Sequence, residues 1–359
     1  MKASPVWAAV AIAALSILNP ARAQSNVTLY GIVDAFGQYL SGDTRNYRLQ
    51  SGGLSGSRFG LRGQEDLGDG LAAVFLLESG INVDDGTNGQ NAFWGRQAYV
   101  GLRSNSWGQL TLGRQYSSIY VIATEYSAFS NVAGPSTNVI GGFGGYEPVR
   151  GSNDSAAGNG GSARVNNSVR YESPEWNGLR GGVLAGLGET SGNTRDNRLL
   201  ETWGRYTSGS FSTMASLVDD KGGPVNATAA RRVITLGASY AFAGIHALAG
   251  YLNVNDRGAA NQDGAGWWLG ADYTFGLQRL KVQYVQSKPK YLSDAKTQAL
   301  GVGWEYMLSK RMSLYSSLTR YQSEDGAGLG RAWFALPPGL TTPSHNDINE
   351  LIGGMRFTF

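Results

Sequence analysis

Apolar and polar residues alternate along most of this chain with a period of two, which is the spacing of a β-strand. In the stretch GWWLGADYTFG, one face collects the apolar side chains Trp267, Leu269, Ala271, Tyr273 and Phe275. The same alternation runs through the last seven residues, GGMRFTF, up to the final phenylalanine. Long helical periodicity is absent, so the pattern predicts an all-β protein.

The connections between the strands are of two lengths, and their count predicts the number of strands. Seven are short and rich in the Gly, Asp, Asn and Ser that tight turns require, at 66–70, 104–108, 173–178, 208–210, 242–244, 275–276 and 308–311. Eight are longer and polar, near 41–56, 84–92, 118–163, 190–197, 221–230, 257–265, 288–294 and 324–348. Because short and long connections alternate, we expect about sixteen antiparallel strands.

The two faces of these strands indicate a transmembrane barrel rather than a soluble sandwich. Each strand offers about 9–12 residues, which fits a tilted membrane strand. A sandwich would need short loops at both ends, whereas here only one end has them, as in outer-membrane barrels. Because lipid offers no hydrogen-bond partners, the sheet must close, pairing the last strand with the first. Sixteen strands leave a lumen too wide for side chains to fill, so the polar face lines a water-filled channel.

The N-terminus predicts export from the cytoplasm. Lys2 is followed by a short apolar stretch, 6–18, and then by Ala-Arg-Ala, a small-x-small cleavage site. Residues 1–23 are therefore expected to be a cleaved signal peptide, and 24–359 to be the barrel domain. The apolar stretch is too short to span a bilayer.

Composition narrows the possible partners. Without Lys2 and Arg22, 28 basic residues face 27 acidic ones, a balance that gives no electrostatic footprint for nucleic acid. The chain has 52 glycines, about twice the usual share, and no cysteine. The fold therefore has no disulfide bonds and no thiols that could be oxidised outside the cytoplasm.

At this point the chain resembles a known family. It is similar to the general porins of the Gram-negative outer membrane, closest to the β-proteobacterial type. The resemblance covers essentially the whole exported chain and rests on VTLYGIVDAF, SRFGLRGQEDLGDGLAAVFLLESG, GRQAYVGL, WGQLTLGRQY and GGMRFTF.

The resemblance implies a set of partners and no cofactor. Family members are trimers embedded in outer-membrane lipid and lipopolysaccharide, and small hydrophilic solutes and inorganic ions diffuse through them. A final phenylalanine with alternating apolar residues before it resembles the signal read by the barrel-assembly machinery. Phe357 and Phe359 would carry that signal here.

The longest connection, 118–163, needs an explanation, because a loop of about 46 residues without periodicity is uncommon. Its second half, GGFGGYEPVRGSNDSAAGNGG, is rich in glycine. One alternative is a flap at the surface. The resemblance implies instead that this third loop folds into the lumen as a constriction.

Basic residues on the polar face are candidates for the wall of that constriction. Arg58 and Arg62 point away from lipid because they alternate with Phe59 and Leu61. Arg96 and Arg164 fall at positions that resemble the family's basic wall, and Arg170 shares the parity of Arg164. The candidate basic wall is therefore Arg58, Arg62, Arg96, Arg164 and Arg170.

Acidic candidates are fewer. Glu125, Glu147 and Asp154 lie on the long loop, and Asp34 and Glu78 lie on the polar face of strands. Opposed charges across a narrow gap create a transverse field that sorts solutes by charge. Since the wall is more basic than the loop is acidic, we expect a weak to moderate preference for anions.

Two alternatives stay open for these residues. The arginines could simply pair with neighbouring carboxylates or loop carbonyls. The channel could also select one class of substrate, such as carboxylates or phosphate, and would then show saturable conductance.

Arg114 differs from the other arginines because it lies on the outward parity of Leu110 and Leu112. A bare charge facing lipid is costly. By the resemblance, Arg114 would pair across a subunit contact with the loop at Asp84 and Asp85. A position just above the lipid edge would also suffice.

Catalytic and metal-binding chemistry is absent from the sequence. The two histidines, His246 and His345, belong to no catalytic grouping, and no zinc, P-loop or nucleophile-elbow motif is present. The stretch VDDGTNG lacks the spacing and the closing Glu of a calcium loop. We therefore expect no enzyme, no resident metal and no cofactor, with calcium binding at the outer loops left open as an alternative. A barrel enzyme would need a His-centred group, and a purely structural anchor would be expected to plug its lumen.

Overall fold

The computed structural model describes residues 26–130, 133–140, 163–189, 191–192, 195–196, 198–221, 230–256, 263–290, 296–324 and 347–359. The predicted signal peptide, and the part of the predicted constriction loop that holds Glu147 and Asp154, lie outside these residues. Within them, no helix has the length and apolarity needed to cross a membrane.

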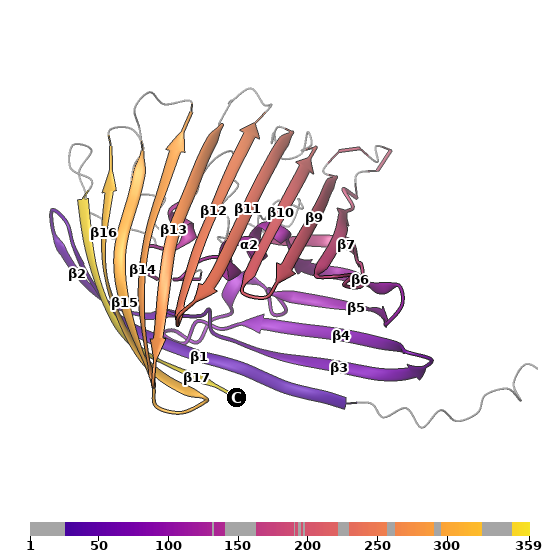
Figure 1. Cartoon of the computed structure of the whole chain (residues 1–359), viewed down its shortest axis with the longest axis horizontal. Helices are drawn as coiled ribbons and strands as arrows, with labels where there is room; N and C mark the ends of the chain where they lie inside the picture. Colours follow the sequence, from indigo (N-terminus) through magenta and orange to yellow (C-terminus); the bar gives the residue numbers. More distant parts are fainter. Residues whose placement is uncertain are drawn as a thin grey trace, which may run out of the picture.

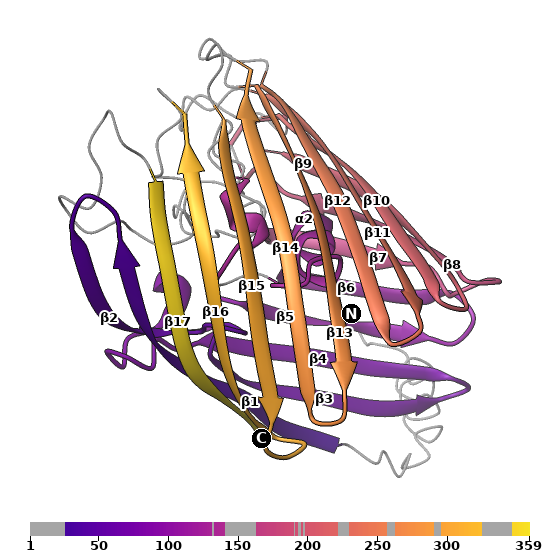
Figure 2. The same cartoon turned by 60° about the vertical axis from the view of Figure 1, so that its left-hand side comes forward.

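The strands form one antiparallel sheet that closes into a barrel (Figure 1, Figure 2). Their bounds are β1 (Asn26–Ser41), β2 (Arg45–Ser51), β3 (Arg58–Gly68), β4 (Leu71–Gly80), β5 (Gln97–Ser104), β6 (Gly108–Tyr116), β7 (Arg164–Glu172), β8 (Leu179–Gly186), β9 (Leu199–Ser208), β10 (Phe211–Asp220), β11 (Arg231–Phe242), β12 (Ile245–Asp256), β13 (Gly264–Phe275), β14 (Gln278–Pro289), β15 (Thr297–Met307), β16 (Met312–Ser323) and β17 (Asp347–Thr358). Three short helical segments accompany them, η1 (Gly89–Asn91), α2 (Ser118–Glu125) and η2 (Thr137–Val139).

The 17 strands fill sixteen positions around the wall, because β2 and β3 share one of them. The first half of β1 pairs with β3 and its second half pairs with β2. This confirms the predicted number of strands. The prediction of a continuous loop at 41–56 is wrong, since β2 lies inside it. Only Tyr47 and Leu49 give β2 an apolar stripe, which is too little to distinguish a strand from a polar loop.

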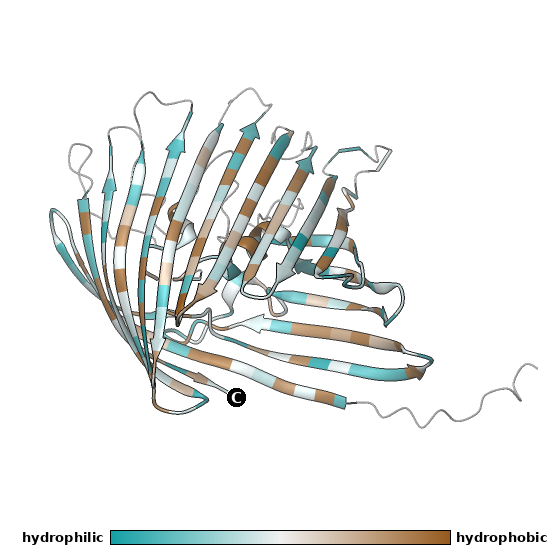
Figure 3. Ribbon diagram, viewed as in Figure 1, coloured by the Kyte–Doolittle hydropathy of each residue, from teal (hydrophilic) through white to brown (hydrophobic). Residues whose placement is uncertain are grey.

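The apolar face of the sheet is the exposed one, as predicted. Trp267 and Leu269 are 39% and 58% exposed, while Trp268 between them is buried. Figure 3 shows the resulting alternation of brown and pale or teal residues along the strands. In a soluble protein such a face would be covered, so its exposure agrees with the transmembrane barrel that the sequence predicts.

Glycine allows the ends of the chain to close the barrel. The backbone of Phe359 exchanges two hydrogen bonds with Gly31 on β1, of 3.0 and 3.1 Å. A Cβ at Gly31 would clash with the Phe359 ring and lie 2.8 Å from the Arg58 carbonyl oxygen. The aromatic ring can therefore lie over the β1 backbone only because position 31 has no side chain.

Substituting Gly31 by alanine is expected to weaken closure. The new Cβ must displace backbone as well as the ring, and overpacking of this kind costs about 1–3 kcal/mol. The measurement is the fraction of barrel folded into vesicles, followed by the shift in gel mobility on heating. Gly353→Ala on β17 is the control, because its Cβ would meet nothing within 4 Å. Equal folding of the two variants would contradict the role of Gly31.

A bulge on β7 interrupts the alternation on which one parity prediction rests. Between the pairs Gly113–Ser168 and Gln115–Val165, β7 advances by three residues and β6 by two. Asn167 in this gap has a φ of 48°, in the left-handed region that Asn tolerates. Alternation is therefore interrupted between Arg164 and Arg170, so the orientation of one cannot be inferred from the other by counting residues, although both side chains contact Tyr116.

The segment that runs from α2 to η2, here called the α2–η2 segment (118–130 and 133–140), packs against the wall. The Ser117 side chain caps α2 by accepting a hydrogen bond from the Tyr120 N–H. Ile122 and Ile140 belong to the same buried apolar cluster as Leu252 and Trp268. Since Trp268 points opposite to Trp267, the segment contacts the face of the sheet away from the exposed apolar side chains.

Side chains from separate strands bind the backbone of this segment. Trp268 Nε1 donates to the Tyr126 carbonyl at 2.6 Å, Gln283 Nε2 donates to the Pro135 carbonyl at 2.6 Å, and the Tyr321 hydroxyl donates to the Gly134 carbonyl at 2.8 Å. Glu201 and Glu350, both buried, accept hydrogen bonds from the N–H groups of Ser118 and Gly134. These bonds fix the segment at many points of the wall.

Candidate functional site

Glu78 on β4 organises a cluster of basic and aromatic side chains. Its Oε1 lies 2.8 Å from Arg96 Nε, and its Oε2 lies 3.8 Å from Arg58 Nε. The hydroxyls of Tyr30 and Tyr116 donate to the two oxygens, each at 2.8 Å. Glu78 is buried, so its charge is already compensated within the cluster. Glu78 therefore binds two arginines of the predicted basic wall and holds them in place.

Arg96 and Arg164 are held by aromatic rings. The rings of Tyr116 and Tyr120 stack with centroids 4.2 Å apart and planes 10° apart. Arg96 lies 5.7 Å from the Tyr116 centroid, and Arg164 lies 5.2 and 5.5 Å from the two centroids. Both arginine residues are only 3% exposed. Aromatic faces attract such cations, most strongly where water is excluded.

Counted over the described residues, the cluster carries a surplus of positive charge. Within the described residues, Arg164 forms no ion pair, and Glu78 is the carboxylate that pairs with both Arg58 and Arg96. Among the described residues, the cluster thus holds three arginines and one carboxylate, which pairs with two of them. The structure brings together Arg58, Arg96 and Arg164 of the predicted basic wall.

Arg170 fits the alternative that an arginine merely pairs with its neighbours. Its Nε lies 2.7 Å from Glu172 Oε1, and its Nη1 donates to the Tyr116 carbonyl at 2.7 Å. Its guanidinium also lies 5.5 Å from the Trp203 ring. Arg170 therefore braces the wall behind Tyr116.

Arg62 lies apart from the Glu78 cluster. It is exposed, and its guanidinium lies 5.4 Å from the Tyr30 ring. Together with Arg103 it lines a second pocket farther along β3.

Asp34 is fully buried and binds a short segment of backbone, residues 52–57, between β2 and β3. Its carboxylate accepts the N–H groups of Gly53, Leu54 and Ser55 at 2.8–3.0 Å and the Tyr315 hydroxyl at 2.5 Å. Both its oxygens are thus engaged by protein groups. Asp34 therefore holds the 52–57 segment in place by hydrogen bonds and is not exposed to water in the lumen.

The 52–57 segment and α2 face each other across a cavity of about 340 Å³. Leu54 and Ser55 line one side, and Tyr120, Val121 and Glu125 line the other. Arg58 and Glu78 also contribute to the lining. The cavity therefore adjoins the surplus positive charge of the Glu78 cluster.

Of the predicted loop acids, only Glu125 is described. It forms an ion pair with Arg205 on β9, and its side chain is 51% exposed. It lines the same cavity as Arg58. Glu125 and Arg58 thus bring opposite charges to one space, as the predicted transverse field requires.

Sequence reasoning missed a second basic group. Glu305 on β15 binds Arg356 on β17 at 2.7 Å and Lys281 on β14 at 3.4 Å. Arg356 also donates to the Ser55 hydroxyl at 3.4 Å, which links this group to the 52–57 segment. The inward position of Arg356 follows from the alternation in GGMRFTF. Assigning a face to every residue of every strand could therefore have identified Arg356 from the sequence.

Arg114 is bound within its own chain. Its Nε and Nη2 donate to the Gly95 carbonyl at 2.9 and 2.7 Å, and Nη1 donates to Asn166 Oδ1. Asp84 and Asp85 are exposed on the loop after β4.

Asp85 is engaged within its own turn. It accepts hydrogen bonds from the Thr87 hydroxyl and N–H, which lower the pKa of its carboxyl. Contact of Arg114 with either aspartate of a second subunit stays a prediction. No group of three or more ligating carboxylates or histidines occurs in the part of the chain that the structure describes.

Comparisons with known proteins agree with this architecture. The family described as Gram-negative porin matches residues 8–326. Outer membrane porin protein 32 of Delftia acidovorans is 34% identical over 336 residues, covering 89% of this chain and 91% of that protein. An outer membrane porin protein of Bordetella pertussis is 32% identical over 292 residues, covering 70% of this chain and 68% of that protein.

Solved structures of porins have the same fold as this chain. The anion-selective porin from Comamonas acidovorans superposes with a TM-score of 0.80 at 28% identity, covering 94% of this chain and 100% of that one. The trimer form of OmpT of Vibrio cholerae shares the fold, with a TM-score of 0.64 at 16% identity and coverage of 93% and 99%. With its closed sixteen-position barrel and the extent of these matches, the chain belongs to the Gram-negative porins, which are outer-membrane channel proteins and not enzymes.

Proposed function

We propose that this porin lets small hydrophilic solutes and ions diffuse passively, with a weak to moderate preference for anions. The observation that carries the proposal is the Glu78 cluster beside the cavity at α2, which among the described residues holds Arg58, Arg96 and Arg164 but one carboxylate. A fixed positive charge in a confined space raises the local concentration of anions and lowers that of cations. Similarity to the anion-selective porin from Comamonas acidovorans supports the same sign of ion selectivity.

The α2–η2 segment is proposed to narrow the channel as part of the 118–163 loop. Three features support this role: its contacts with the face opposite the lipid, its hydrogen bonds to five wall side chains, and the cavity that α2 shares with the 52–57 segment. A loop held at so many points can keep charges such as Glu125 at a fixed distance from the opposite wall. Fixed distances are what a transverse field requires.

The test is the reversal potential of the purified protein in a planar bilayer across a roughly tenfold KCl gradient. We expect a potential of the sign that marks chloride as the more permeant ion, well below the limit for perfect selectivity. Lower ionic strength should enlarge it, because screening weakens as the Debye length grows. A strong preference for potassium would contradict the proposal.

We further propose a homotrimer whose outer face contacts lipid and lipopolysaccharide and which the barrel-assembly machinery inserts. The exposed apolar side chains of the barrel, and Phe357 and Phe359 in the closing strand, support this assignment. Arg114, Asp84 and Asp85 are the proposed subunit contacts. Native mass spectrometry should give three times the chain mass, and a monomer under all detergent conditions would contradict it.

A further inference from the structure

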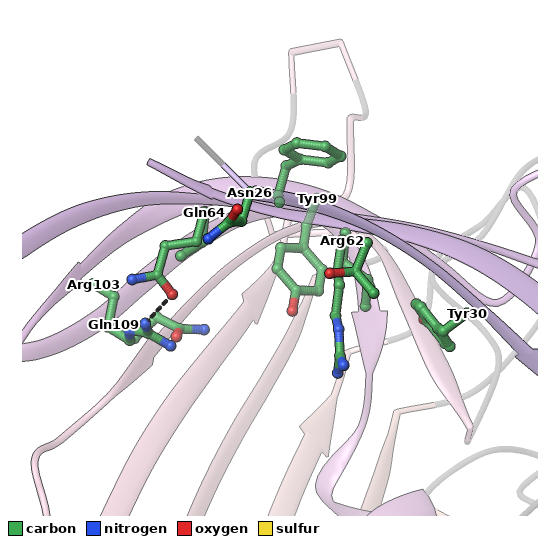
Figure 4. A pocket seen from close by; sticks show the side chains of 12 residues that line it. Asn26, Tyr30, Arg62, Gln64, Tyr99, Arg103 and Gln109 are labelled. Carbon is green, nitrogen blue, oxygen red and sulfur yellow. Dashed lines mark hydrogen bonds between the residues drawn. The ribbon is translucent and has the colours of Figure 1, made fainter. Parts of the chain in front are cut away.

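A pocket of about 480 Å³ lies on the inward face of β1, β3, β4, β5 and β6, apart from the Glu78 cluster (Figure 4). Its polar lining comes mainly from Asn26, Arg62, Gln64, Tyr99, Arg103 and Gln109. Arg62 follows Arg58 by four residues on β3, a displacement of about 13 Å toward the tight turn at Asp69. Since short turns mark the periplasmic rim of such barrels, the pocket lies between the proposed constriction and the periplasm.

The pocket has two cationic side chains and no carboxylate among its lining residues. In the described part of the chain, neither Arg62 nor Arg103 forms an ion pair. Arg62 lies over the Tyr30 ring at 5.4 Å, and Arg103 donates a hydrogen bond to Gln64 Oε1. Each guanidinium therefore keeps donors that point to solvent or to a ligand.

The acids that share the register of Arg103 are already engaged. Pairing across the strands aligns Arg103 with Asp66 on one side and with Glu172 on the other. Glu172 forms ion pairs with Arg170 and Arg180, and Asp66 accepts the Gly68 N–H at 2.9 Å. Neither acid forms an ion pair with Arg103 in the described part of the chain, and the lining residues of the pocket carry two positive charges and no negative one.

The two cations stand at opposite ends of the pocket. Arg62 is in register with Tyr99 through Leu76, and Arg103 lies four residues beyond Tyr99 on β5. Strand spacing and rise then separate the Arg62 and Arg103 Cα atoms by about 16 Å. Figure 4 shows Tyr99 between Arg62 on one side and Arg103 with Gln109 on the other. An anion long enough to meet both guanidinium groups would cross the Tyr99 ring.

We propose that this pocket is a second anion subsite that binds linear dicarboxylates, with one carboxylate at Arg62 and the other at Arg103. The alkyl chain between the two carboxylates lies against Tyr99, and the amides of Gln64 and Gln109 complete the hydrogen bonds. The subsite rests on the proposed channel function, since a solute reaches it from the lumen. It would concentrate dicarboxylates at the periplasmic mouth and make their passage saturable.

Equilibrium dialysis of the purified protein in detergent, with labelled adipate or hexanoate at about 50 mM KCl, tests this directly. The two probes have the same number of carbons and differ in the second carboxylate. We expect adipate to bind more tightly than hexanoate. Arg62→Gln and Arg103→Gln should each weaken adipate binding by about fivefold, the upper range for an exposed ion pair. The double variant should bring adipate close to hexanoate.

Arg279→Gln is the matched control, because Arg279 is an inward arginine of β14 that pairs with Asp272 on another part of the wall. It removes the same charge and should leave adipate binding unchanged. Equal binding of adipate and hexanoate, or an equal loss in Arg279→Gln, would overturn the subsite. Heat-dependent gel mobility confirms that each variant is folded.

Single-channel recording separates the failure of this inference from the failure of the channel function. With the subsite present, adipate should lower the ion current in a saturable manner that Arg62→Gln and Arg103→Gln relieve. An open channel that adipate never affects would overturn the subsite while the porin function stands. A folded protein without conductance would overturn the function, and the dialysis result would still decide the subsite.

Discussion

Arg58→Glu is expected to turn the channel from a preference for anions to a preference for cations. Arg58 lines the cavity at α2, and its guanidinium offsets the charge of Glu78. The substitution changes the local charge by two units. At about 8 Å in water, two unit charges interact by about 0.5 kcal/mol, so a two-unit change shifts each ion by about 1 kcal/mol, in opposite directions for cations and anions.

The combined shift of about 2 kcal/mol would change the permeability ratio by roughly thirtyfold, and salt screening reduces this to about tenfold. The sign of the reversal potential across a KCl gradient shows whether the Arg58→Glu channel prefers potassium or chloride. Arg58→Lys keeps the charge and should keep the sign of the parent protein. If Arg58→Glu still preferred chloride as strongly as the parent, selectivity would reside elsewhere on the wall.

Asp34→Ala is expected to destabilise the protein and to make its conductance noisy. The substitution leaves the N–H of Gly53, which is buried, the N–H groups of Leu54 and Ser55, which are partly buried, and the Tyr315 hydroxyl without their acceptor. Losing a buried acceptor of this kind costs at least about 3 kcal/mol, since each orphaned donor carries its own penalty. The effect should be larger than for any single surface substitution.

The functional consequence follows from what the 52–57 segment contacts. The Gly53 carbonyl accepts the Ala133 N–H at 3.2 Å, and Ser55 accepts a bond from Arg356. Freed from Asp34, the segment would release its hold on the α2–η2 segment and on one side of the cavity. Charges that are no longer fixed should produce a higher mean conductance and larger current fluctuations.

Thermal unfolding in detergent and single-channel noise measure the two effects. Asp66→Ala is the control, because Asp66 is exposed and accepts a single N–H within its turn. Asp34→Asn keeps the size of the side chain and should give an intermediate result. An Asp34→Ala channel as quiet as the parent would show that the 52–57 segment does not support the loop.

The two arginines on either side of the bulge illustrate the limit of parity reasoning. Arg164 and Arg170 are both even-numbered, yet Asn167 inserts an extra residue between them. Arg170 is then drawn to Glu172, while Arg164 lies on the Tyr116 and Tyr120 rings. Alternation could assign both arginines to the polar face. It could not predict that Arg170 pairs with a carboxylate while Arg164 lies over aromatic rings.

Asp34 and Glu78 show the same limit for charge. Both were placed on the polar face by alternation, and both are on it. Burial decides what they do there, because a buried carboxylate must be met by hydrogen-bond donors or cations. Asp34 meets backbone N–H groups, and Glu78 meets arginines and tyrosines. Neither set of partners is near in the sequence.

The sequence by itself determined the barrel, its strand number and its exposed apolar face. These properties depend on period-two alternation and turn chemistry, which are local and repeat along the chain. The family followed separately, from the resemblance of stretches such as GRQAYVGL and GGMRFTF to known porins. Only the tertiary structure decided which arginines share Glu78, how Asp34 holds the 52–57 segment and that Arg62 and Arg103 flank one pocket. Those arrangements depend on register and side-chain contact between strands far apart in the chain, and alternation carries no information about either.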